Sequence, residues 1–434
     1  MIEPREAWRR LLGHLSPLPA ERVARRRAFG RVLAEPLAAT LDVPFADVSA
    51  MDGYALAAPE ERASEPVGGG GASGAAARGG AAGEGGGGGF DLPGGGFDLP
   101  VAGVVAAGDP PGATLPPGSA LRIMTGAPLP AGADRVVPLE DTDRGRERVV
   151  VERLRGSGAN VRRRGEIVAA GAELLPAGAP LTAGAMALLA AHGHAEVAVH
   201  AAPRVALLVT GDEVVAPEDE PGPGQLRDTH TDFLLAAASA LGVELAGLGR
   251  APDRKDELRR RVEAGLADAD VLLISGGVSK GEFDFVEEVL AALGCRPLFT
   301  AVAIQPGKPL VAAAGPVGGR TRLVFGLPGN PGAVMTCYWL FVRPALRRLM
   351  GHRDGWLHGL VAGELAAPAP GAKERHLFVP AEVDAEGARL RVVPVPSRGS
   401  HDLAATARGT ALLWVPPGMR PRKAGEPCSV LPIV

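Results

Sequence analysis

Residues 271–285 read VLLISGGVSKGEFDF, an apolar run that ends in Ser-Gly-Gly and then carries Lys280, Glu282 and Asp284. The apolar run is typical of a buried strand, and helical spacing of apolar residues resumes beyond the loop. Glycines let a ligand approach backbone N–H groups closely, whereas a loop that only reverses the chain does not need three charges. The stretch therefore predicts a strand, a ligand-binding loop and a helix.

The alternation of predicted strands and helices extends over residues 203–350. Further strands are predicted at 204–210 (RVALLVT), 243–249 (VELAGLG) and 321–327 (TRLVFGL), and helices within 228–242, 253–269, 284–294 and 331–350. Asn330 is the expected N-cap of the last helix, with Pro331 in its first turn. Alternating βα units of this length predict a doubly wound, mostly parallel α/β domain with helices on both faces.

The rest of the 434-residue chain is organised differently. Short valine-rich runs with many glycines and prolines predict β-rich domains before residue 203 and a β-barrel-like domain at 351–434. An amphipathic helix around Trp8 and Leu11 opens the chain. The expected domains are 1–45 with 167–202, an inserted β-rich domain at 46–166, the α/β domain at 203–350, and 351–434. Residues 64–96, almost all Gly and Ala, predict a disordered insertion, after which the second copy of FDLP leads back into the fold.

Composition narrows the possible partners and the compartment. Forty-six Lys and Arg against 49 Asp and Glu give a net charge of −3, which argues against a nucleic-acid or anionic-membrane surface. The three cysteines, Cys295, Cys337 and Cys428, are too far apart in sequence for a zinc site or a disulfide framework, which suggests a reducing compartment. Since neither a signal peptide nor an apolar run of 18 residues is found, we expect a cytoplasmic protein.

In a parallel α/β sheet, ligands bind at the carboxyl ends of the strands. Four polar, glycine-bearing loops follow the predicted strands: 210–213 (TGDE), 250–253, 275–284 and 326–331 (GLPGNP). They would place Glu213, Asp253 and Asp284 where glycines and helix N-termini favour an anion. Carboxylates repel phosphate, so a bridging Mg²⁺ is expected. With Lys280 and Lys308 adding positive charge, the pattern predicts a phosphorylated substrate bound with Mg²⁺.

Each element of this pattern also has a purely structural interpretation. SGGVS and GLPGNP could be simple turns between a strand and a helix. Asp253 stands where a helix N-cap belongs. The run of three arginines at 162–164 is typical of a solvated face. These alternatives stay open when each signal is taken alone, whereas their common placement at one edge favours a ligand site.

Seven motifs in order resemble the molybdopterin molybdenumtransferase family, which includes MoeA and the gephyrin E-domain. They are SAMDGYAL (49–56), RIMTGAPLP (122–130), RRRGE (162–166), TGDE (210–213), SGGVS (275–279), PGKP (306–309) and GLPGNP (326–331). The resemblance covers the whole chain except the Gly-rich insertion.

The resemblance implies an enzyme of molybdenum cofactor biosynthesis. Members insert molybdate into adenylylated molybdopterin and release AMP with Mg²⁺. It also implies a homodimer, formed through residues 1–45 and 167–202, whose active site lies between the α/β domain of one subunit and the MDGYA domain of the other. Contact with the molybdopterin adenylyltransferase is a further expectation.

Matching the motifs residue by residue gives the candidate site. The catalytic candidates are Asp52, Thr125, Glu213, Asp253, Asp284 and Lys308. The substrate-binding candidates are Ser275, Gly276, Gly277, Ser279, Pro328, Asn330, Pro331 and, in SRGSH, Ser400. Glu213, Asp253 and Asp284 are the Mg²⁺ candidates, and Lys308 and Ser400 would receive the molybdate oxyanion.

The chain departs from the family pattern at four positions: Ile167, Ala301, Gln305 and Pro380. Many members carry an acidic residue at the first and basic residues at the other three. Because the chain has fewer basic side chains at these positions, two further hypotheses about its function stay open. It could be a pterin-binding scaffold without activity, or a paralogue with altered metal preference. A third is adenylyl transfer to molybdopterin, which does not need the extra domains.

Overall fold

The computed structural model describes residues 1–57, 90–91, 96–252, 254–277, 285–317, 320–386 and 389–433. These residues form two compact units, a larger one from Met1–Glu35 with Pro176–Val434 and a smaller one from Pro36–Leu175. Most of the insertion predicted to be disordered lies outside the described residues. Within it, Phe90–Asp91 forms the short strand β5, which pairs with β10 (Arg153–Leu154). The first FDLP copy supplies the two residues that pair, Phe and Asp.

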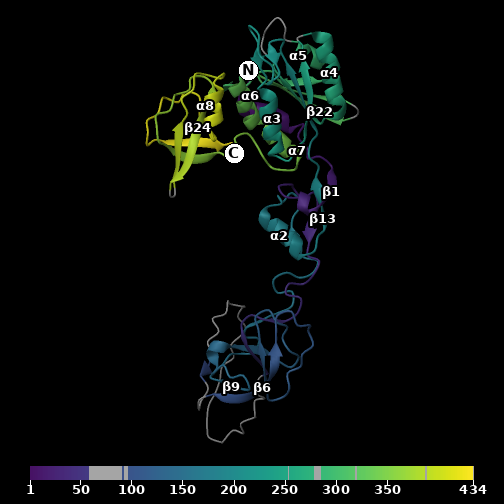
Figure 1. The fold of residues 1–434 in the computed structure, drawn as a ribbon, viewed down its shortest axis with the longest axis vertical. Helices are drawn as coiled ribbons and strands as arrows, with labels where there is room; N and C mark the ends of the chain where they lie inside the picture. The colour runs from purple at the N-terminus through teal and green to yellow at the C-terminus, as the bar shows by residue number, and fades with distance from the viewer. Residues whose placement is uncertain are drawn as a thin grey trace, which may run out of the picture. The chain divides into compact units, whose positions relative to one another are not determined.

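A six-stranded sheet is the centre of the larger unit (Figure 1). Its order is β17 (Leu245–Ala251), β14 (Val205–Thr210), β18 (Val271–Ser275), β22 (Arg320–Leu327), β21 (Val311–Val317) and β19 (Arg296–Phe299). The first four strands are parallel to their neighbours, as predicted, while β21 and β19 add on antiparallel. Every residue of β14 and β18 is buried, which explains why both read as continuous apolar runs.

Helices cover both faces of this sheet, as the alternation predicts. On one face α1 (Pro4–Leu12), α3 (His230–Ser239) and α6 (Pro331–Cys337) share an apolar core with the strands. On the other face α4 (Lys255–Asp268) and α5 (Val286–Ala292) form a second core with them. Figure 1 shows α4 and α5 grouped on one side of β22, with α3 and α6 on the other. In α4 the apolar residues at helical spacing, Leu258, Val262 and Leu266, are all buried.

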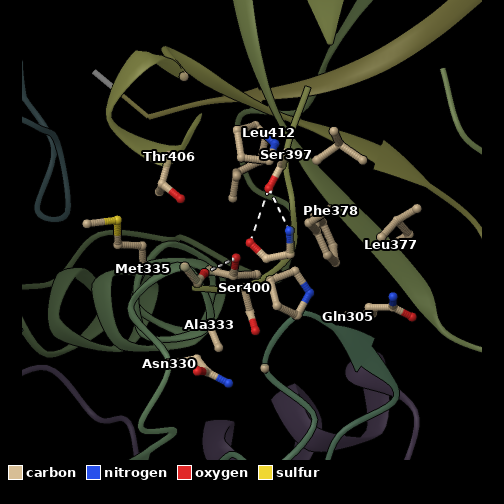
Figure 2. Close-up of a pocket in the computed structure, with 18 of the residues that line it drawn as sticks. Gln305, Asn330, Ala333, Met335, Leu377, Phe378, Ser397, Ser400, Thr406 and Leu412 are labelled. Atoms are coloured by element: carbon tan, nitrogen blue, oxygen red, sulfur yellow. Dashed lines mark hydrogen bonds between the residues drawn. The ribbon is translucent and has the colours of Figure 1, made fainter. Parts of the chain in front are cut away.

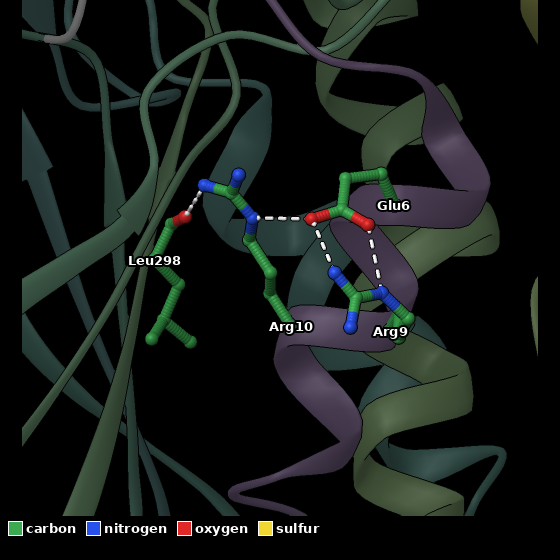
Figure 3. Close-up of polar contacts among 4 residues, drawn as sticks. All are labelled: Glu6, Arg9, Arg10 and Leu298. Atoms are coloured by element: carbon green, nitrogen blue, oxygen red, sulfur yellow. Dashed lines mark hydrogen bonds and ion pairs between the residues drawn. The ribbon is translucent and has the colours of Figure 1, made fainter.

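The opening helix α1 is attached to the sheet by packing and by polar contacts. Trp8 and Leu11 are buried, as predicted from their spacing. On the exposed side Glu6 accepts hydrogen bonds from Arg9 and Arg10, and the Arg10 guanidinium also donates to the Leu298 carbonyl oxygen of β19 at 2.9 Å (Figure 3). The arginines hold the pKa of Glu6 at about 2. The contact with Leu298 fixes α1 against the antiparallel edge of the sheet.

The last helix of the α/β domain is interrupted by one wide turn. From α6 the chain continues through the π-helical turn η3 (Tyr338–Val342) into α7 (Arg343–Leu349). Pro344 lies at the start of α7 and cannot donate a backbone hydrogen bond into the preceding turn, which a wider turn accommodates. Tyr338 and Phe341 are fully buried, so this segment crosses the main core.

The C-terminal region forms the predicted barrel. Five strands close on one another in the order β24 (His376–Glu386), β25 (Arg389–Pro394), β23 (Val361–Leu365), β27 (Pro427–Pro432) and β26 (Ala411–Val415), and β26 pairs back to β24. The helix α8 (Leu403–Arg408), which was not predicted, begins at the capping residue Asp402. A two-residue strand of the α/β domain, β20 (Ile304–Gln305), pairs with β24 and joins the two domains.

The smaller unit contains a five-stranded sheet in the order β8 (Arg135–Pro138), β4 (Gly53–Leu56), β7 (Ala120–Ile123), β6 (Phe97–Val105) and β9 (Arg148–Val151). Strand β4, which lies between β8 and β7, carries Gly53–Leu56 of the SAMDGYAL motif. Tyr54 is fully buried and its hydroxyl donates to the Gly145 carbonyl oxygen at 2.7 Å. A Cβ atom at Gly53 would lie 2.0 Å from the Val137 carbonyl oxygen, so only glycine allows β4 and β8 to pair this closely.

Shorter elements complete the described chain. In the larger unit these are β1 (Ala20–Ala24), η1 (Arg25–Arg27), α2 (Ala183–Ala191), β13 (Glu196–His200), β15 (Val214–Val215) and β16 (Leu226–Arg227). In the smaller unit they are β2 (Leu37–Ala38), β3 (Val48–Ser49), η2 (Leu139–Asp141), β11 (Val161–Arg162) and β12 (Glu173–Leu175). None of the helices in the described ranges has the length and apolar character needed to cross a membrane.

Candidate active site

The carboxyl ends of β14, β17, β18 and β22 meet at one edge of the sheet, because these strands are parallel. The loops singled out in the sequence therefore lie together there. The Gly276 N–H donates to the Leu327 carbonyl oxygen at 3.1 Å, so the SGG turn touches the start of GLPGNP. Asp253, Ser279 and Asp284 fall outside the described residues, and their candidate roles stay predictions. The N-cap position of α4 is held by Arg254, not by Asp253.

Two consecutive glycines shape the turn after β18. Gly276 and Gly277 have φ angles of +94° and +64°, a region that L-residues with side chains rarely adopt. A Cβ atom at Gly276 would lie 2.6 Å from the Thr210 carbonyl oxygen, and one at either glycine would lie 2.9 Å from the Thr210 hydroxyl. This hydroxyl is buried and has no hydrogen-bond partner in the described part of the chain. The turn thus presents bare backbone at the sheet edge.

Ser275, the last residue of β18, is fully buried, and its hydroxyl lies 2.7 Å from Nδ1 of His230. Burial lowers the pKa of His230, so the imidazole is neutral at pH 7, although nearby Asp228 partly opposes the shift. Asp228 also accepts the backbone N–H groups of His230 and Thr231 and so fixes the start of α3. The Ser275 hydroxyl is therefore engaged with His230, and its role in substrate binding stays a prediction.

Sequence reasoning did not single out His230 or Asp228. The usable signal was the Asp-Thr-His that opens the predicted helix, since an aspartate there is a common cap. Nothing in the local spacing, however, indicated that His230 meets Ser275, which lies 45 residues further on.

Glu213 is exposed at the end of β14, and its carboxylate lies over Gly211. A Cβ atom at Gly211 would lie 2.7 and 2.8 Å from the two carboxylate oxygens, so the glycine makes room for them. Across residues for which coordinates are described, no group of three or more His, Cys, Asp or Glu side chains could hold a metal. Mg²⁺ often uses only one or two carboxylates together with substrate phosphates, and Glu213 fits the role of one such ligand.

A cavity of about 930 Å³ lies in the larger unit, where residues 305–309, the start of α6 and the barrel meet. Four predicted site residues line it: Lys308, Pro328, Asn330 and Ser400. In Figure 2, Asn330 and Ser400 lie beside α6, and Gln305 lies on the opposite side. Residues from three motifs far apart in the sequence thus share one cavity.

Backbone contacts hold these residues in place. Asn330 occupies the N-cap position of α6, as predicted, but its side chain makes no capping hydrogen bond and is left to line the cavity. The Gly332 N–H donates to the Ser400 carbonyl oxygen at 2.8 Å, which docks the SRGSH loop on α6. Asp402 accepts from the backbone N–H groups of Arg398 and Ala405, so the loop that carries Ser400 is itself ordered.

In the smaller unit the two predicted residues Asp52 and Thr125 are in contact. Oδ1 of Asp52 accepts from the Thr125 backbone N–H at 2.7 Å and from its hydroxyl at 2.8 Å. The two hydrogen bonds from Thr125 lower the pKa of Asp52 and keep its carboxylate ionised, and the bond from the backbone N–H has the larger effect. Both residues are exposed. The motifs SAMDGYAL and RIMTGAPLP therefore build one polar surface site.

The arginine run at 162–164 serves a structural role. The Arg163 guanidinium pairs with Asp47 at 2.5 Å and that of Arg164 with Asp42 at 2.6 Å. Backbone N–H groups add to these pairs, and both aspartates have lowered pKa values. Since their charges are matched by carboxylates, Arg163 and Arg164 do not mark an anion site.

Three parts of the chain match known protein families. Residues 2–193 match the MoeA N-terminal region (domains I and II), residues 206–348 a probable molybdopterin-binding domain, and residues 362–433 the MoeA C-terminal region (domain IV). The molybdopterin molybdenumtransferase of a Nostoc species is 37% identical over 332 residues, which is 76% of this chain and 69% of that protein. The protein of the same name from Staphylococcus aureus is 29% identical over 99% of this chain and 95% of its own length.

A solved structure agrees with the sequence matches. The crystal structure of a molybdopterin biosynthesis MoeA protein from Pyrococcus horikoshii superposes with a TM-score of 0.76 at 28% identity, and covers 100% of this chain and 99% of that one. The chain therefore belongs to the molybdopterin molybdenumtransferase family.

Proposed function

We propose that the protein is an enzyme of molybdenum cofactor biosynthesis that inserts molybdate into adenylylated molybdopterin and releases AMP. The observation that supports this most directly is the cavity in which Lys308, Asn330 and Ser400, from three separate motifs, come together. A lysine ammonium, an amide and a hydroxyl supply the donors that a tetrahedral oxyanion requires.

The sheet edge next to this cavity is the proposed phosphate side of the site. The backbone of Gly276 and Gly277 can approach a phosphate without interference from side chains. Glu213, together with Asp253 and Asp284, is proposed to hold Mg²⁺, which when bound would neutralise charge on the substrate phosphates. Pro328 and Pro331 lie in the turn that leads into α6, and Pro328 also lines the cavity.

The contact of Asp52 with Thr125 is assigned to the same reaction. Its exposed, ionised carboxylate has one oxygen committed to Thr125, which leaves Oδ2 for substrate or metal. We propose a homodimer in which this surface completes the site of a second copy. A cytoplasmic location and contact with the molybdopterin adenylyltransferase complete the proposal.

AMP release tests the proposal. Purified protein is mixed with adenylylated molybdopterin, Mg²⁺ and either molybdate or tungstate, and AMP is measured. We expect oxyanion-dependent release of AMP, reduced about 10- to 100-fold in Glu213→Gln. Glu218→Gln, an exposed carboxylate five residues further on, is the matched control and should behave as wild type. Without AMP release the scaffold hypothesis is favoured, and AMP transfer from ATP to molybdopterin would instead indicate the adenylyltransferase.

A further inference from the structure

The side chain of His230 reaches the SGG turn, residues 275–277, although no motif selected it. Its Nδ1 lies 2.7 Å from the hydroxyl of Ser275, the residue directly before the two glycines. Ser275 is fully buried, and among the residues that the structure describes this is the one hydrogen bond that its hydroxyl makes. His230 therefore holds the residue from which the turn starts.

The segment 226–231, which carries this histidine, also contacts the loop that carries Glu213. Strand β16 pairs with β15, and the Leu226 N–H donates to the Glu213 carbonyl oxygen at 2.9 Å. The Asp228 N–H donates to the Val215 carbonyl oxygen, also at 2.9 Å. One segment thus joins the TGDE loop to the SGG turn, the two loops proposed to form the phosphate side of the site.

The helix α3, which begins with His230, is anchored to the main core of the larger unit. The Tyr338 hydroxyl donates to the Ala237 carbonyl oxygen at 2.8 Å, and the rings of Phe233 and Tyr338 meet edge to face with centroids 5.5 Å apart. At the start of the helix, the buried Asp228 accepts the backbone N–H of His230 at 2.9 Å. The imidazole is therefore presented from a rigid support, as a positioning residue requires.

We propose that His230 is a positioning residue of the SGG turn and that it acts through the Ser275 hydroxyl. The ligand class is a phosphate ester or anhydride; its identity as the phosphates of adenylylated molybdopterin rests on the proposed function. Because Gly276 and Gly277 offer only backbone to a ligand, the position of that backbone sets the affinity. Without His230 the buried Ser275 hydroxyl would lose its partner, which is costly, so the turn would shift.

Two substitutions at this position separate a positioning role from a role in charge or proton transfer. Asparagine places an amide atom close to where Nδ1 lies and can donate or accept a hydrogen bond, but it does not titrate. Leucine is similar in size to histidine and has no polar atom. His230→Asn should therefore keep the turn in place, whereas His230→Leu should release it.

The rate of AMP release at varied concentrations of adenylylated molybdopterin tests the proposal in the full-length protein. We expect His230→Leu to raise KM about five- to tenfold, the effect of one neutral hydrogen bond, with kcat within about twofold of wild type. His230→Asn should stay within about twofold in both constants. Ser275→Ala should also raise KM, and the double variant with His230→Leu should be no worse than the poorer single variant. Asp232→Asn, an exposed position in the same turn of α3, is the matched control and should behave as wild type.

Hydrogen exchange of residues 271–277 tests the same inference without the reaction. The Gly276 N–H donates to the Leu327 carbonyl oxygen at 3.1 Å, and a released turn should exchange this proton about tenfold faster. We expect faster exchange in His230→Leu and Ser275→Ala, and the wild-type rate in His230→Asn and Asp232→Asn. Thermal unfolding identifies any variant that fails to fold, and Ser275→Ala removes the same hydrogen bond should His230→Leu do so.

The outcomes for the inference and for the proposed function are distinct. Unchanged exchange in the folded variants, His230→Asn as impaired as His230→Leu, or multiplied losses in the double variant would overturn the inference. Faster exchange in His230→Leu without any AMP release by the wild type would contradict the proposed function alone. Normal AMP release by the wild type with an unchanged KM in folded His230→Leu would contradict the inference alone.

Discussion

Adding a single methyl group at Gly332 should slow AMP release and leave the stability of the protein nearly unchanged. It lies in the first turn of α6, and its N–H donates to the Ser400 carbonyl oxygen at 2.8 Å. A Cβ atom there would lie 3.0 Å from that oxygen and 3.3 Å from the Thr406 hydroxyl. Its φ angle is not positive, so Gly332→Ala places no strain on the backbone itself. The added methyl group acts only on the docked SRGSH loop.

The size of the effect follows from these distances. An ordinary contact between the new Cβ atom and the Ser400 carbonyl oxygen requires a separation of about 3.4 Å or more. The SRGSH loop must therefore move away from α6 by roughly 0.4 Å. Because a 1 Å misplacement can cost on the order of 100-fold in rate, a shift of this size corresponds to roughly sixfold. Replacing glycine within a helix gains about 0.5–1 kcal/mol, which offsets the weakened hydrogen bond, worth about 1 kcal/mol. We therefore expect slower AMP release with nearly unchanged stability.

The measurement is the initial rate of molybdate-dependent AMP release, together with urea unfolding of the same preparations. Gly329→Ala is the matched control, because it lies in the same turn, has no positive φ and meets no atom within 4 Å. Equal rates for Gly332→Ala and wild type would refute the role assigned to the docked loop. So would an equal loss in Gly329→Ala, which would show that the turn tolerates no change anywhere.

Three further predictions concern stability. Gly53→Ala should prevent folding of the smaller unit, because the new Cβ atom would lie 2.0 Å from the Val137 carbonyl oxygen; loss of its cooperative melting transition is the readout. Thr210→Val should be neutral or stabilising in urea unfolding, since the buried hydroxyl has no partner in the described chain, whereas Thr142→Val, which loses two hydrogen bonds, should cost about 1–2 kcal/mol. Burial lowers the pKa of His352 to about 4, so the folded state resists a proton that the unfolded state binds. Stability should therefore fall by up to about 3 kcal/mol between pH 6.5 and 4, and His352→Gln should remove this part of the pH dependence.

The α/β domain was largely predictable because its signals are local. Continuous apolar runs, helical spacing and glycine-bearing loops identified β14, β17, β18 and β22 and their common edge. The antiparallel strands β19 and β21 were missed, since residues 296–317 contain short runs without a clear period. In a parallel sheet the order of the strands brings their carboxyl-end loops together, so the sequence alone indicates that these loops lie at one edge.

The cavity was not predictable in this way. Lys308, Asn330 and Ser400 were selected by their motifs, but nothing local indicates that a barrel loop docks on α6. The contact of His230 with Ser275 is missed for the same reason. Contacts between distant side chains depend on packing that no short window of sequence contains.

The barrel is part of the site's framework and not an attached module. Phe378, Leu412 and Leu431 of the barrel are buried in the same apolar cluster as Phe325 and Tyr338 of the α/β domain. Strand pairing of β20 with β24 adds a directional constraint to this shared core. A domain held only by a polar surface would be free to move, and the two sides of the cavity would then vary in separation. Because core packing and backbone hydrogen bonds act together here, Lys308 and Ser400 are held at a fixed spacing, as the proposed site for a small rigid oxyanion would require.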